Sequence, residues 1–228
     1  MRRLIPVLLL ALPLAVGCSN DSTAPTSANS AILRIVHGSP DTGPVDVYNA
    51  GALVVQGLPY ANASAFSAYT VGANEFQVRP TGAVNLLLDV TPNLAAGTAY
   101  TLAVIGTDGV YDSVLLTDDT TTVASGNFRL RLVQLAPLGP AMDLYLTGAT
   151  DDITNLTPTI AGVAYKSASP YVTPAAGAVR LRITQAGSKT VLIDSGVLNL
   201  SSGQVLSLMV FGKPGTGGGG APYSAQLF

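Results

Sequence analysis

Residues that build reactive sites are scarce in this sequence: among 228 residues there is one cysteine, one histidine and no tryptophan. Transition metals such as zinc are usually held by several Cys and His side chains, so no such site is expected. A Ser-His-Asp triad would need the single histidine, His37, and the Gly-x-Ser-x-Gly motif that positions such a serine is absent. We therefore expect no cofactor and no enzyme activity.

Charged residues are also few, at 11% of the chain, against about a quarter in ordinary globular domains. There is one glutamate and there are three lysines, although long amphipathic helices need such residues on their wet faces. Hydrophobic residues make up 48%, which excludes a disordered chain. The abundance of Val, Thr and Tyr favours strands. With a net charge of −2 and no basic patch, nucleic acid is not an expected partner.

The N-terminus has the three parts of an export signal. Arg2 and Arg3 supply a positive start, Leu4–Leu14 is a short apolar run, and Ala15–Gly17 are small residues before a cleavage point. The next residue, Cys18, is the only cysteine and stands where bacterial lipoprotein signals place the lipidated residue. We therefore interpret residues 1–17 as a lipoprotein signal peptide. The alternative is an ordinary secretory signal with an incidental cysteine.

Lipidation of Cys18 would make the membrane a partner of the protein. Each buried methylene contributes about 0.8 kcal/mol, so several acyl chains would hold the chain permanently. Ser19 favours sorting to the outer membrane, and whether the protein faces the periplasm or the exterior is left open. Residues 18–30 are small and polar after the cysteine. They are interpreted as the lipidated Cys and a flexible tether.

The rest of the chain contains one pattern twice. Arg34–Gly51 reads RIVHGSPDTGPVDVYNAG, and 97 positions later Arg131–Gly148 reads RLVQLAPLGPAMDLYLTG without a gap. A repeat at this spacing predicts two tandem domains, at residues 31–125 and 126–228. Further matches follow in the same order: Tyr60 with Tyr165, Ser64 with Ser169, Phe66 with Tyr171, and Gly72 with Gly177.

The pattern of apolar residues predicts an all-β fold. Strand signals recur about every ten residues, and Glu75–Arg79 alternates so that Phe76 and Val78 would face inward. A strand is also expected at Val84–Val90. The segments Tyr100–Ile105 and Val205–Phe211 are apolar on both faces, as central strands of packed sheets are. We expect each repeat to be an immunoglobulin-like antiparallel β-sandwich of two packed sheets.

The first copy of the repeat also resembles a known family. HGSPDTGPVDVY at His37–Tyr48, followed by Tyr60, Ala65-Phe66 and a Val71-Gly72 turn, is similar to the bacterial envelope family called domain of unknown function (DUF) 4397. The second copy departs from the motif, with Leu135–Leu138 in place of Gly-Ser-Pro-Asp. The resemblance implies a surface or periplasmic β-sandwich, often in tandem and often on lipoproteins, with no established reaction.

Four polar residues of the repeated segment are candidates for a site. A hydrolase acting on polysaccharide or peptide would need His37, Asp41 and Asp46 to converge in a cleft. The second copy has Gln134 in place of His37, so the scaffold requires only a polar residue at that strand end. Asp46 recurs as Asp143. These carboxylates would then accept N–H groups of the Ser-Pro-Asp or Gly-Pro loops.

Two tyrosines and two acidic pairs complete the candidates. Tyr48 and Tyr145 share a repeat position and would form either an exposed aromatic binding patch or ordinary strand residues. Calcium is the only metal worth considering, because its ligands are oxygens. The weak candidates are two loop pairs without the spacing of a calcium loop: Asp118 with Asp119, and Asp151 with Asp152.

The sequence favours a lipid-anchored, non-enzymatic envelope protein whose two modules bind a protein or a glycan or act as a structural spacer. A surface hydrolase of polysaccharide or peptide is the alternative.

Overall fold

The computed structural model of the protein describes residues 29–213 and 223–228. In that part of the chain all regular secondary structure is β-strand, which confirms the all-β expectation. The strands up to the middle of the chain are β1 (Ser30–Gly38), β2 (Val45–Asn49), β3 (Ala52–Leu58), β4 (Ser67–Thr70), β5 (Gly72–Ala73), β6 (Phe76–Pro80), β7 (Leu88–Val90), β8 (Asn93–Leu94), β9 (Ala99–Thr107) and β10 (Val110–Asp118).

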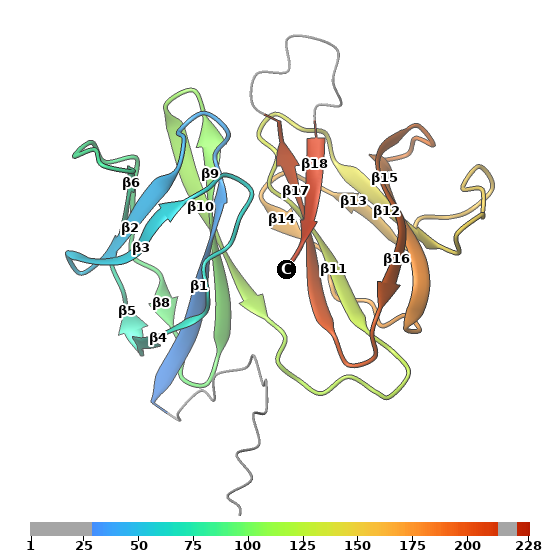
Figure 1. The fold of residues 1–228 in the computed structure, drawn as a ribbon, viewed down its shortest axis with the longest axis horizontal. Helices are drawn as coiled ribbons and strands as arrows, with labels where there is room; N and C mark the ends of the chain where they lie inside the picture. The colour runs from blue at the N-terminus through green and yellow to red at the C-terminus, as the bar shows by residue number, and fades with distance from the viewer. Residues whose placement is uncertain (1–28, 214–222) are drawn as a thin grey trace, which may run out of the picture.

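The remaining strands are β11 (Arg129–Gln134), β12 (Met142–Thr147), β13 (Ile160–Val163), β14 (Ser167–Ala168), β15 (Gly177–Gln185), β16 (Val191–Leu200), β17 (Val205–Gly212) and β18 (Tyr223–Leu227). Strands β1–β10 and β11–β18 form two halves that lie side by side (Figure 1). The chain passes from one half to the other once, between β10 and β11.

Each half has two four-stranded sheets packed face to face. In the first half they have the orders β10-β9-β1-β4 and β3-β2-β6-β7, with β5 and β8 as a small extra pair. In the second half the orders are β14-β11-β17-β18 and β13-β12-β15-β16. The repeat-related strands therefore occupy the same places. Each half has its own apolar core, built around Phe76 in the first and Phe128 in the second.

Sheet pairing differs from the antiparallel expectation in one respect. β1 pairs with β9 in parallel, and β11 pairs with β17 in parallel. Parallel strands need a long connection, and here the chain between them crosses to the other sheet and returns twice. The short turns of the sequence predict hairpins but carry no information about pairing between strands so far apart.

The central strands are buried on both faces, but not in the way that we expected. Leu102 and Val104 of β9 face the core of their own half, whereas Ala103 and Ile105 belong to a third apolar cluster. That cluster joins the halves. Its buried members from the first half are Val36, Ala103, Ile105 and Leu116, and those from the second are Val133, Leu135, Met209 and Phe211. A two-sheet sandwich covers only one face of each sheet; for the sheets that contain β9 and β17, the other half covers the second face.

Candidate functional site

His37 lies at the end of β1 and is fully buried. Its Nδ1 accepts the N–H of Ser39 at 3.4 Å, and its Nε2 lies 2.8 Å from the carbonyl oxygen of Gly43. Because Nδ1 is the acceptor, Nε2 carries the proton and donates it to Gly43. Burial lowers the pKa of His37, against smaller opposing effects of the Gly43 carbonyl and Asp41. The neutral ring therefore closes the loop that follows β1.

Gln134 closes the equivalent loop in the second half. Its Oε1 accepts the N–H of Ala136 at 2.9 Å, and its Nε2 donates to the carbonyl of Pro140 at 3.0 Å. As with His37, the N–H that the side chain accepts lies two residues further along the chain, and the carbonyl to which it donates lies later in the same loop. An amide and a neutral imidazole can each present one acceptor and one donor in this arrangement. The geometry of His37 is that of a loop-closing residue.

Asp46 and Asp143 also occupy equivalent places. Asp46 accepts the N–H of Gly57 at 2.8 Å, and Asp143 accepts the N–H of Gly162 at 2.7 Å. A second bond comes from the N–H of Gly82 to Asp46 and from that of Gly187 to Asp143, at 3.3 and 2.9 Å. The donors are thus backbone N–H groups of neighbouring turns. They do not come from the Ser-Pro-Asp or Gly-Pro loops that we expected.

Asp46 is held in its charged form. Burial alone would raise the pKa of Asp46, but hydrogen bonds from Gly57, Gly82 and the hydroxyl of Thr81 lower it below the usual value. A carboxylate that accepts three such bonds joins strands and turns. It is poorly suited to give or take a proton near neutral pH.

Asp41 faces a different part of the molecule. Its Oδ2 accepts the N–H of Asp108 at 2.6 Å and the hydroxyl of Tyr111 at 3.3 Å, both in the β9–β10 hairpin. His37 is bonded within its own loop, and Asp46 is bonded to turns of the other sheet. Each of the three groups is engaged with a separate segment.

Tyr48 and Tyr145 do not form an exposed patch. Tyr48 is half-buried under the guanidinium of Arg79, 5.1 Å from its ring centroid. Tyr145 is 2% exposed and carries Lys189 over its ring at 4.5 Å. The alternative of an exposed patch is wrong for Tyr145, because the loop after β12 and the β15–β16 turn cover it: Lys189 donates to both its hydroxyl and the carbonyl of Leu156.

The acidic pairs considered for calcium are engaged elsewhere. Asp118 pairs with Arg131, and Asp119 pairs with Arg129 at 2.6 Å. Asp151 accepts the N–H of Gly148, and Asp152 accepts the N–H and the hydroxyl of Thr154. Within residues 29–213 and 223–228 no three His, Cys, Asp or Glu side chains gather as a metal site would require.

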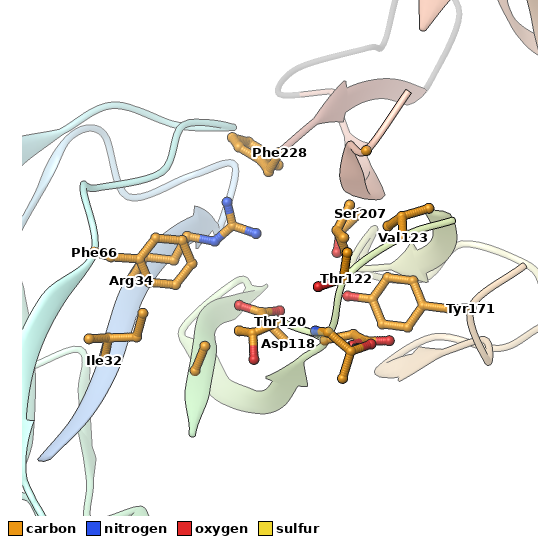
Figure 2. Close-up of a pocket in the computed structure, with 15 residues that line it drawn as sticks. Ile32, Arg34, Phe66, Asp118, Thr120, Thr122, Val123, Tyr171, Ser207 and Phe228 are labelled. Atoms are coloured by element: carbon orange, nitrogen blue, oxygen red, sulfur yellow. Dashed lines mark hydrogen bonds between the residues drawn. The ribbon is translucent and has the colours of Figure 1, made fainter. Parts of the chain in front are cut away.

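A cavity of about 380 Å³ lies between the two halves. Figure 2 shows Arg34 and Phe66 of the first half across from Tyr171 and Ser207 of the second, with Phe228 at the rim. The connection between the halves forms one wall, through Asp118–Val123. Aromatic and hydroxyl side chains from both halves meet here with the charged side chains of Arg34, Asp118 and Asp119.

Arg34 is the charged group that the sequence analysis missed. Its guanidinium carbon lies 4.8 Å from the ring centroid of Phe66 and 5.7 Å from that of Phe228. Its Nε donates to the hydroxyl of Thr101 at 2.9 Å. Arg131 repeats the stack on Tyr171 at 4.8 Å. The repeat aligns both pairs, so the recurrence of an arginine with an aromatic partner was a signal in the sequence.

The two arginines differ in what their outer nitrogens contact. Arg131 donates to the hydroxyl of Ser207, to the carbonyl of Thr117 and to the carboxylate of Asp118. For Arg34, no hydrogen bond or ion pair joins Nη1 or Nη2 to any residue that the structure describes, and in Figure 2 these atoms point into the open space.

A scan against family models matches residues 31–145 to the family described as "Domain of unknown function (DUF4397)". The match spans about half of the chain and confirms the resemblance seen in the sequence. The chain belongs to this family.

In this DUF4397 chain the matched region reaches from β1 into β12. It includes Arg34, Phe66 and Asp118, whereas Tyr171, Ser207 and Phe228 lie beyond it. The family model therefore covers only one side of the cavity and the connection.

Other comparisons give little more for this DUF4397 protein. No curated protein matches it. Among solved structures it is similar to the family CBM26 module CBMbc from Eubacterium rectale Amy13K in complex with maltoheptaose, at 12% identity over 87% of this chain and 96% of that one. The TM-score is 0.27, so this likeness supports no argument about ligand.

Two features bear on the membrane. No helix in residues 29–213 and 223–228 is long and apolar enough to cross a membrane. Cys18, the residue of the expected lipid anchor, lies outside the described residues, as do the expected signal peptide and most of the tether.

Proposed function

We propose that this protein is an exported, non-enzymatic envelope lipoprotein anchored through Cys18, and that its two halves bind a protein or glycan ligand in the cavity between them. In this proposal residues 1–17 are removed, residues 18–30 are the tether, and residues 31–125 and 126–228 are two duplicated immunoglobulin-like modules. The outer membrane is the proposed location.

The cavity is the observation that carries the binding part of the proposal. Its volume of about 380 Å³ is in the range of small-ligand sites. Three aromatic rings (Phe66, Tyr171 and Phe228) line it, together with Arg34, whose Nη1 and Nη2 bond no residue that the structure describes. Apolar walls with a few directed polar groups are typical of binding sites. The apolar cluster between the halves gives the walls a fixed spacing, which a flexible pair of spacer domains would lack.

The polar candidates support binding over catalysis. The hydrolase alternative needs His37, Asp41 and Asp46 in one cleft, and each is bonded to a different segment. The neutral ring of His37 and the hydrogen-bonded carboxylate of Asp46 are structural elements that recur in the second half as Gln134 and Asp143. The cavity is therefore the better candidate for the functional site.

Anchoring and location are tested on intact cells. The full chain and the Cys18→Ala variant are expressed in a double-membrane bacterium, and each is followed by fractionation and by added protease. We expect the native chain in the outer-membrane fraction and the variant in the soluble envelope fraction. A native chain that stays soluble, or a variant that stays in the membrane, overturns the anchor.

Binding is tested with the purified full chain in detergent, on a glycan array and by capture from envelope extract. A ligand that protects the chain against thermal unfolding supports the proposal. If no glycan, protein or small molecule binds, the spacer function replaces it.

A further inference from the structure

The two equivalent arginines at the interface between the halves have unequal partners. Thr101 and Ser207 are related by the repeat, and each accepts from the Nε of its arginine. Asp118 lies between the two arginines but gives its ion pair to Arg131 alone. It reaches Arg34 only indirectly, by accepting the hydroxyl of Thr101 at 2.7 Å. Within the described chain, Arg34 thus has its inner nitrogen Nε bonded and its outer fork, Nη1 and Nη2, free.

Because Arg34 is half-buried, leaving its outer N–H donors without partners is unfavourable in free energy. Burial lowers the pKa of Arg34; the charge of Asp118 opposes this, and the charge of Arg131 adds to it. A guanidinium nevertheless stays protonated in proteins, so a positive charge remains in a half-buried place with N–H donors unsatisfied. Stacking against Phe66 and Phe228 fixes the plane of the group and leaves its edge open. An oxyanion that meets this edge with two oxygens would satisfy the donors.

We propose that the cavity between the halves binds a small molecule bearing a carboxylate, which the outer fork of Arg34 holds with two parallel hydrogen bonds while the apolar and threonine-lined walls hold its body. This proposal rests on the proposed binding function and names its ligand class.

The other charges at the cavity select a carboxylate over a phosphate. Asp118 and Asp119 both line the cavity, and each is already neutralised by an arginine, Arg131 and Arg129 respectively. The uncompensated charge is therefore the single charge of Arg34. One negative charge balances it, whereas a doubly charged phosphate monoester would face two carboxylates with no second free cation among the described lining residues.

The residues that line the cavity indicate which chemical groups the ligand carries besides its carboxylate. Ile32, Ala99, Val123 and Val205 supply apolar surface, and Thr120–Thr122 supply hydroxyls along the connection. A sugar acid and an aromatic acid each fit this mixture, because both combine a flat or apolar face with a carboxylate. The two sources of the carboxylate are separated by experiment.

The test is calorimetric titration of the purified full chain in detergent with four probes: glucuronate, benzoate, glucose and inorganic phosphate. We expect at least one carboxylate to bind at least tenfold more tightly than glucose and phosphate. The Arg34→Gln variant should weaken that carboxylate about 10- to 100-fold, because a charged hydrogen bond contributes roughly 1.5–3 kcal/mol. Arg34→Lys keeps the charge but not the two parallel N–H donors, so its affinity for the carboxylate should lie between those of the native chain and of Arg34→Gln.

Two further variants control for damage to the fold. Arg79 is also stacked on an aromatic ring but lies in the other sheet, away from the cavity, so Arg79→Gln should leave binding unchanged. Thr122 is an exposed residue of the connection that lines the cavity. Thr122→Trp should therefore block binding with Arg34 intact, and it provides the answer if Arg34→Gln does not fold.

The outcomes separate this inference from the function on which it rests. Carboxylate binding that a folded Arg34→Gln variant leaves unweakened overturns the inference, and so does carboxylate binding that survives Thr122→Trp. Tighter binding of glucose or phosphate than of either acid, abolished by Thr122→Trp, also overturns it but leaves a ligand-binding protein. Binding of none of the four probes, together with no glycan or protein ligand, overturns both.

Discussion

The equivalence of His37 and Gln134 leads to a sharp prediction: His37→Gln should cost little stability at neutral pH. Glutamine can accept the N–H of Ser39 and donate to the carbonyl of Gly43, as Gln134 does for its own loop. What the variant loses is the edge contact between the His37 and Tyr60 rings, 5.8 Å apart. We expect a decrease of about 1 kcal/mol in the free energy of unfolding.

His37→Leu is the matched variant that removes both bonds. It leaves the buried N–H of Ser39 without its partner, whereas the carbonyl of the exposed Gly43 keeps the hydroxyl of Thr42 at 3.1 Å. Since an unsatisfied buried group costs about 1–3 kcal/mol and the ring contact with Tyr60 is lost as well, we expect a loss of roughly 2–4 kcal/mol. Denaturant unfolding followed by tyrosine fluorescence and circular dichroism measures both variants, as the chain has no tryptophan.

The same pair of variants has a pH signature. The pKa of His37 is lowered in the folded protein, so the unfolded chain binds the proton more readily. The contribution of the neutral ring to the free energy of unfolding is therefore complete above the usual pKa near 6.5. It decreases as the pH drops below that value, by at most about 1.4 kcal/mol per pH unit. His37→Gln should lack this pH dependence. The difference in free energy of unfolding between the native chain and His37→Gln should therefore shrink or reverse toward pH 5.

Two results would refute the reasoning. One is a His37→Gln variant as unstable at neutral pH as His37→Leu, which would mean that the imidazole does something an amide cannot. The other is an unchanged difference in stability between pH 7.5 and about pH 5, because His37 is the only histidine and no other imidazole can supply the slope.

Further predictions concern the interface between the halves and the turn carboxylates. Arg131→Met should cost about 3 kcal/mol in denaturant unfolding because it leaves Asp118 half-buried and unpaired, and adding Asp118→Leu should restore part of the loss. Asp46→Ala should cost about 2 kcal/mol at neutral pH; since the pKa of Asp46 is lowered, this difference should vanish as the pH falls through its folded value. In an absorbance titration, Tyr60→Phe should remove a tyrosine step near pH 12, the raised pKa that burial gives Tyr60. Met209→Glu should separate the halves, so the radius of gyration in X-ray scattering should rise while the strand signal in circular dichroism persists.

Local patterns in the sequence predicted much of the fold. The alternation at Glu75–Arg79 placed Phe76 and Val78 inward, and both are fully buried. Periodicity is a local signal, which is why it works where one strand faces one core. It was wrong for the start of Val84–Val90, where only Leu88–Val90 is a strand and Val84 is 84% exposed. Residues 83–87 are irregular instead, and the turn at Thr81–Gly82 that precedes them brings the N–H of Gly82 to Asp46.

The site was harder to predict because it depends on how the halves pack. The sequence marked Ala103 and Ile105 as buried without saying against what, and only the structure shows that they meet the other half. The repeated Asp46 and Asp143 were candidates because carboxylates are common in active sites. A residue repeated in both copies is, however, equally well explained by a bond that both copies need. For these two the shared bond is to Gly57 and Gly162.

Function in a repeated scaffold is better sought where the copies differ in their surroundings. Arg34 and Arg131 are the same residue, on the same strand position, stacked on equivalent rings. Two like halves packed face to face would bury both arginines alike, but the chain connects the halves on one side only, and there β10 ends with Asp118 turned toward Arg131. Asp118 accepts from Arg131 with one oxygen and from the hydroxyl of Thr101 with the other, so within the described chain its ion pair does not extend to Arg34. The connection therefore satisfies one arginine and leaves the other facing a cavity, with Nη1 and Nη2 bonded to no described residue. That asymmetry is what makes Arg34 the residue whose substitution separates binding from folding.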